Sequence, residues 1–142
     1  MGFLLSGEHV GRLKRRARSF LIEAERVDDP DLSLFFAEQA IQLYVKAVYF
    51  ELFGGRIRGH RIREMLGLLA KSLEAEGFKV HASRVLEFIA QHRDNLIILE
   101  EAYSMSRYGD IEYSKDDASL AILIAKSLVN LLEEVCRDVK LG

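Results

Sequence analysis

Apolar residues recur every three or four positions along five stretches of the chain, a spacing typical of amphipathic helices. The longest polar interruption, Tyr103 to Asp110, separates the last two of these stretches. Before it, the apolar face comprises Val85, Phe88, Ile89, Leu96, Leu99 and Ala102. After it, the face comprises Leu120, Leu123, Ile124, Leu128, Leu131 and Val135. No run alternates as a strand requires, so we predict an all-α, up-and-down antiparallel bundle of about five helices.

Helix start and stop signals set the expected boundaries. A first helix is expected from a Ser6 cap to about residue 27, and a second from Pro30, capped by Asp29, to the two glycines at 54–55. A third helix is expected from near His60 to about residue 76, and a fourth from residues 81–83 to about 105. The fifth is expected after Ser114, with Asp117 completing a capping box. The stretch from Tyr103 to Asp110 is then expected to form a polar loop.

Length and composition favour one domain over residues 1–142, since a chain of this size buries a sufficient core without metal or disulfide. The net charge of −2 gives no overall attraction to nucleic acid or anionic membrane. The single cysteine, Cys136, and the absence of a signal-peptide pattern or a membrane-length apolar run predict a cytoplasmic protein. Abundant lysine, arginine and glutamate indicate a thermophilic source.

Candidate chemistry is sparse. The four histidines are too widely spaced to predict a metal site, and no sequence signature predicts a cofactor. A basic run, comprising Arg12, Lys14, Arg15, Arg16 and Arg18, is interpreted as a solvated helix face, with a phosphate contact as the alternative.

Two positions carry the candidate site. His60, at a helix start, is suited to meeting an anion, although it could equally be a capping or packing residue. Arg107 offers a planar fork of donors for phosphate or carboxylate. Its alternative role is an ion pair with Asp110 or Glu112 that stiffens the turn.

Three segments resemble the HEPN domain family, and they occur in the family's order. The segment Phe36-Ala37-Glu38-Gln39-Ala40, followed by Lys46-Ala47, resembles the family's second-helix signature. The segment from Gly59 to Leu66 is similar to its third-helix start, and Arg107-Tyr108-Gly109-Asp110 resembles its Arg-Tyr-Pro-Asp signature, which places the chain in an Arg-Tyr-x-Asp subgroup.

The resemblance implies a helical bundle that pairs as a homodimer and binds nucleotide or RNA. It also implies a minimal nucleotidyltransferase partner in a toxin-antitoxin pair. The RNase members carry an arginine followed by a histidine after four to six residues, and no histidine follows Arg107 at that spacing. Gly109 also stands where relatives carry proline.

The resulting hypothesis is a ligand site formed by His60, Arg107, Tyr108 and Asp110. Arg107 would hold a phosphate, His60 would donate to it, Tyr108 would stack on a base and Asp110 would orient the arginine. One alternative is a metal-independent RNase, in which His60 is the general base and Arg107 stabilises the charge on phosphorus. Another is an interaction module without a ligand site, in which Tyr108 or a solvent-facing Tyr113 could be adenylylated by the partner.

Overall fold

Every regular element in the described part of the chain is a helix. The computed structural model describes residues 2–108 and 112–142, except for the side chains of residues 2–6 and 105–108. The six helices are α1 (Gly2–Arg26), α2 (Pro30–Phe53), α3 (Ile62–Ala75), α4 (Lys79–Gln91), α5 (Arg93–Tyr108) and α6 (Lys115–Leu141). The predicted all-α bundle is therefore confirmed.

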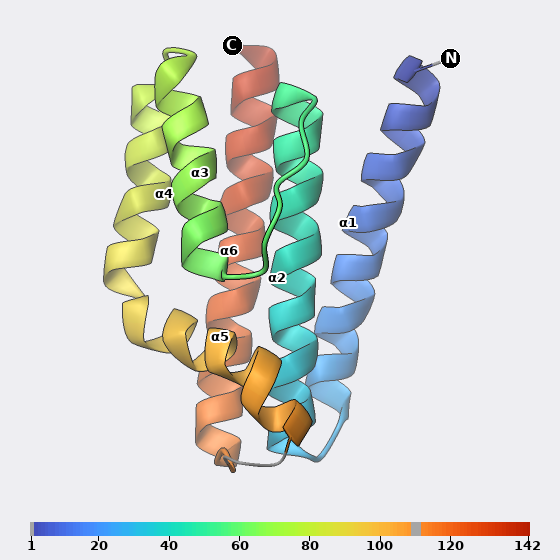
Figure 1. Cartoon of the computed structure of the whole chain (residues 1–142), viewed down its shortest axis with the longest axis vertical. Coiled ribbons are helices and arrows are strands. Elements are labelled where there is room, and N and C mark those ends of the chain that lie inside the picture. Colours follow the sequence, from blue (N-terminus) through green and yellow to red (C-terminus); the bar gives the residue numbers. More distant parts are fainter. Residues whose placement is uncertain (1, 109–111) are drawn as a thin grey trace.

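Helix α2 forms the centre of the bundle and contacts α1, α3, α5 and α6. Figure 1 shows α1, α2 and α6 running along the long axis, with the α3–α4 hairpin to one side and α5 crossing obliquely. The inward face of α2 is fully buried at Leu34, Ile41, Tyr44, Val45 and Val48. Apolar surface removed from water contributes roughly 25 cal/mol per Å² to the free energy of unfolding. Burial of this face therefore makes α2 the helix that holds the layers together.

Three of the predicted helix ends are confirmed by their caps. Asp29 accepts a hydrogen bond from the backbone N–H of Asp31, and Pro30 begins α2. Gly54 ends α2 with a φ of 72°, a left-handed conformation that glycine adopts without steric cost. Ser114 and Asp117 form the predicted capping box of α6. The predicted Ser6 cap is wrong, because α1 already begins at Gly2.

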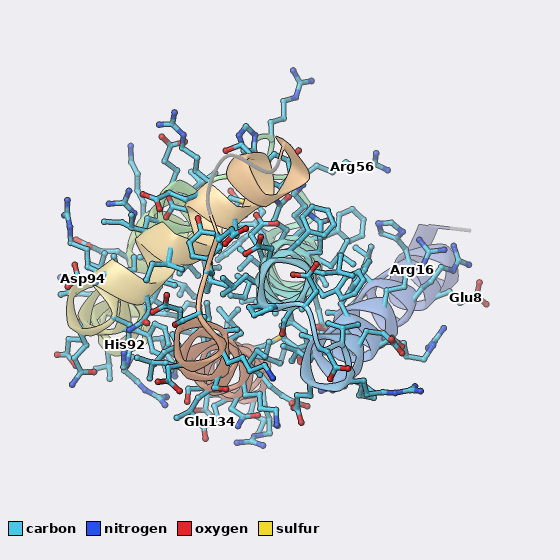
Figure 2. All side chains as sticks on the ribbon, turned by 90° about the horizontal axis from the view of Figure 1, so that it is seen from below. Glu8, Arg16, Arg56, His92, Asp94 and Glu134 are labelled. Carbon is cyan, nitrogen blue, oxygen red and sulfur yellow. The ribbon has the colours of Figure 1, made fainter. Side chains whose placement is uncertain are left out.

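The expected fourth helix is divided in two at His92. Helix α4 packs mainly on α3, whereas α5 packs mainly on α2, so the chain changes direction between them (Figure 1). His92 and Asp94 mark this junction in Figure 2. The sequence has no proline or glycine at this bend, and its apolar periodicity runs through the bend without a break. The pattern therefore predicts one helix where the structure has two. The expected loop from Tyr103 onward is also wrong in part, because α5 remains helical through Tyr108.

Two side chains expected in the core lie at the surface. Leu120 is 49% exposed and Leu123 is 60% exposed on α6, where Ile124, Leu128 and Val135 are buried instead. The apolar stripe of α6 is wider than the face covered by α1, α2, α4 and α5. No helix among the described residues is long and apolar enough to cross a membrane.

Candidate functional site

A groove of about 380 Å³ lies between the start of α3 and the second half of α5. Its lining comprises His60, Arg61, Arg63, Ile97, Glu100, Glu101, Tyr103 and Ser104. The segment that links α2 to α3 returns along α2 before α3 begins, which brings residue 60 beside α5 (Figure 1). The groove therefore joins segments about forty residues apart in sequence.

The rings of His60 and Tyr103 stack at one side of this groove. Their centroids are 4.8 Å apart and their planes differ by 23°, a distance and angle within the range of offset-stacked aromatic pairs. Gly59 precedes the histidine with a φ of 101°, a conformation that other residues rarely adopt. His60 itself is exposed, so its ring presents both apolar surface and ring nitrogens to the groove.

An ion pair between Arg63 and Glu100 connects α3 to α5 within the groove. Arg63 donates from Nε to Glu100 Oε2 at 2.8 Å and from Nη2 to Oε1 at 3.2 Å. This two-point geometry fixes both side chains more firmly than a single contact. The hydrogen bonds to Glu100 raise the pKa of Arg63, so the guanidinium stays charged. Arg63 therefore neutralises Glu100, while a second carboxylate, Glu101, and a second arginine, Arg61, which pairs with Glu64 at 3.5 Å, also line or border the groove.

Glu38 is a fully buried carboxyl group near this ion pair. Gln42 donates to its Oε2 at 2.5 Å, and Gln39 donates to its Oε1 at 2.8 Å. Burial raises the pKa of Glu38 to about 7, because a carboxylate loses its hydration inside the bundle. The two glutamines and Lys46 oppose this rise, and the nearby charge of Glu100 adds to it.

The predicted site residues fall into two groups. His60 lies in the groove, but the side chains of Arg107 and Tyr108 and all of Asp110 lie outside the described residues. The backbone of α5 is helical through residue 108, so Arg107 follows Tyr103 by one turn of the same helix. A site shared by His60 and Arg107 stays a prediction.

Two other sequence interpretations need correction. Tyr113 does not face solvent: its hydroxyl is buried with no hydrogen-bond partner among the described residues, which argues against its modification. The basic run of α1 is only partly solvated, since Lys14 donates to Glu51 at 2.7 Å and Arg18 bonds Glu133 at 2.9 Å. These two residues therefore hold α1 against α2 and α6.

Sequence reasoning missed the roles of Glu38 and Tyr103. In the sequence, Glu38 belongs to a family signature, and it stands four residues after buried Leu34 and three before buried Ile41. That spacing places a carboxyl group on the inward face of α2 and could have identified it. The stacking of Tyr103 on His60 depends on the bend at His92, and no residue of the sequence predicts that bend.

Most of the chain matches a known protein family. The model of the HEPN domain matches residues 10–135, which is most of the chain and includes all six helices in whole or in part. No match was found among curated proteins or among solved structures. The six-helix bundle and the match over nearly its whole length lead to one conclusion: the chain belongs to the HEPN domain family.

Proposed function

We propose that this HEPN domain binds a nucleotide or RNA in the groove between the start of α3 and the end of α5. The observation that carries the proposal is the stacked pair of His60 and Tyr103 beside two arginines, Arg61 and Arg63. Aromatic faces that stack on bases, combined with cations that bind phosphate, are the usual elements of single-stranded nucleic acid recognition.

Each groove residue has a role in this proposal. A base stacks on the His60–Tyr103 pair, and His60 or Arg61 donates to a phosphate. The ion pair of Arg61 with Glu64 is exposed and 3.5 Å long, so a phosphate can replace it at little cost. Arg107, one turn after Tyr103 on α5, is proposed as a further phosphate ligand, with Tyr108 to stack on a base and Asp110 to orient the arginine.

A second candidate function is protein interaction. Leu86 on α4 and Leu120 and Leu123 on α6 are between 48% and 60% exposed, and apolar side chains of this size are common at the centre of protein interfaces. We propose that the domain pairs as a homodimer in the cytoplasm. A minimal nucleotidyltransferase partner, as in a toxin-antitoxin pair, belongs to the same proposal.

Thermal stabilisation by a panel of nucleotides and short RNAs tests the groove proposal. A ligand present at a hundred times its dissociation constant adds about 2.7 kcal/mol to the free energy of unfolding. We expect a shift for the wild type, and loss of the shift in His60→Ala and in Arg107→Ala. His81→Ala is the matched control, because His81 pairs with Asp138 at the α4–α6 contact. Absence of any shift in the wild type would favour the interaction module.

A further inference from the structure

A second groove, of about 400 Å³, lies between α4 and α6, on the side of the bundle away from α1 (Figure 1). It forms because α4 packs mainly on α3 and only lightly on α6. Its apolar lining consists of the buried ring of Phe88 on α4 and the half-buried side chain of Leu131 on α6. This α4–α6 groove shares no lining residue with the groove at His60.

Polar side chains line both edges of the α4–α6 groove and lack partners within the domain. Four of them are exposed and form no hydrogen bond or ion pair with the described residues: Glu87, Gln91, Ser127 and Asn130. The one arginine of the lining, Arg84, donates to Glu134 at 2.7 Å and lies 3.8 Å from Asp138. Because two acids already share this arginine, Glu87 is left without a cation and the groove is acidic.

Two exposed leucines extend the α6 edge toward the start of that helix. Leu123 and Leu120 stand four and seven residues before Ser127, a spacing that places all three on one face of α6. From Leu120 to Leu131 this face runs for about three turns, or roughly 16 Å. Figure 2 shows Glu134, further along the same helix, pointing outward from the bundle. A partly apolar surface of this length fits a short helix laid along it.

The charge of the groove decides which kind of helix fits. In a two-fold pair of identical chains, each residue meets the same surface of the other copy, so Glu87 would face a second acidic groove. Like charges facing each other across an interface disfavour association, whereas opposite charges favour it. The acidic edge therefore favours a basic partner over a symmetric second copy.

We propose that the α4–α6 groove is the docking site for a basic amphipathic helix of a partner protein. Apolar side chains of that helix pack on Phe88, Leu131 and Leu123, and a lysine or arginine pairs with Glu87. Gln91 and Asn130 offer hydrogen bonds to polar groups at its edges. This inference rests on the second candidate function, protein interaction, and deepens it by assigning a surface and a partner chemistry. It is independent of ligand binding at His60.

The test uses three fluorescein-labelled synthetic peptides of about 15 residues, a length of roughly four helical turns. Two peptides carry leucine at helical spacing on one face, with lysine on the other face in one peptide and glutamate in the other. The third has the composition of the lysine peptide in scrambled order. Fluorescence anisotropy measures the binding of each peptide to the whole protein.

Two variants remove the two proposed contacts, and each has a matched control. Leu123→Ser removes an exposed leucine of the α6 edge, and Leu86→Ser removes an exposed leucine of α4 that does not line the groove. Glu87→Lys reverses the unpaired charge, and Glu74→Lys makes the same change at an exposed position on α3. Unchanged melting temperatures verify that each variant is folded.

We expect the lysine peptide to bind the wild type roughly tenfold or more tightly than the glutamate and scrambled peptides. Leu123→Ser should weaken this binding by roughly tenfold, because a leucine contact is lost, while Leu86→Ser leaves it unchanged. Glu87→Lys should remove the preference for lysine over glutamate, and Glu74→Lys should keep it.

The opposite results overturn the docking site. They are no binding of the lysine peptide, equal affinity for all three peptides, or binding that survives Leu123→Ser. A wild type that sediments as a dimer and a Leu123→Ser variant that sediments as a monomer would identify a second copy as the occupant, and would also overturn the proposal.

The same assays separate this inference from the proposed functions. A monomeric wild type that binds the lysine peptide supports the docking site and contradicts the homodimer. Peptide binding without any nucleotide binding supports the docking site and contradicts the His60 groove alone. His60→Ala should bind the lysine peptide as the wild type does, and loss of peptide binding in this variant would contradict the independence of the two sites.

Discussion

Replacing Glu38 by glutamine removes a fully buried carboxyl group from α2. In the folded protein burial disfavours the carboxylate and raises the pKa of Glu38 to about 7, against 4.5 for a glutamate side chain in water. The folded state therefore holds a proton more tightly than the unfolded state between these two values. Proton binding by Glu38 therefore stabilises the folded state fully below pH 4.5, and this stabilisation is lost as the pH rises to 7.

The magnitude follows from the size of the shift. A difference of about 2.5 pKa units corresponds to about 3 kcal/mol in the free energy of unfolding between pH 4.5 and pH 8. Glu38→Gln keeps the side-chain shape without the charge. We therefore expect the variant to lose this fall in stability and to be more stable than the wild type at pH 8.

Urea denaturation of both proteins between pH 4.5 and pH 9 measures the effect. Glu74→Gln is the control, because Glu74 is an exposed carboxylate on α3. It should leave the pH dependence of the wild type in place. If Glu38→Gln shows the same pH dependence as the wild type, the carboxyl group is not the source, and the reasoning from its burial is refuted.

Three further predictions concern the α1–α2–α6 contact and the α6 cap. Hydrogen bonds from Lys14, Cys136 and Lys140 outweigh burial and lower the pKa of Glu51 to about 2. Glu51→Gln should therefore lower the free energy of unfolding by about 2 kcal/mol at pH 7, and the variant should lose less stability than the wild type between pH 4.5 and pH 2. Urea denaturation measures both effects. Burial raises the pKa of the Cys136 thiol to about 12, so iodoacetamide at pH 8 should alkylate the unfolded but not the native protein, and rapid native alkylation would contradict this. Ser114→Ala should cost about 1 kcal/mol in the same denaturation assay through loss of the capping box, and an equal loss in an exposed control, Ser119→Ala, would be evidence against the cap.

The fold could be predicted from the sequence because local signals are strong in most places. The Asp29-Pro30 start, the Gly54 stop and the Ser114 cap each determine a helix end through backbone geometry that few other residues satisfy. The bend at His92 could not be predicted in this way. It arises because α4 and α5 pack on different neighbours, and tertiary packing of that kind leaves no mark on local periodicity.

The candidate site could be predicted only in part. The sequence identifies His60 by its position near a helix start and by its family motif. Its stacking on Tyr103 depends on α5 crossing α2, and the sequence does not predict that crossing.

The most direct test of the account is an NMR titration of the ¹⁵N-labelled domain with a mononucleotide. If the groove binds nucleotide, the amide signals of residues 60–63 and 97–104 should shift together with one dissociation constant, while those of the α4–α6 contact around His81 and Asp138 stay in place. His60→Ala should abolish these shifts. Saturable shifts confined to other parts of the bundle, or none at millimolar nucleotide, would contradict the central claim that the His60–Tyr103 groove is the ligand site.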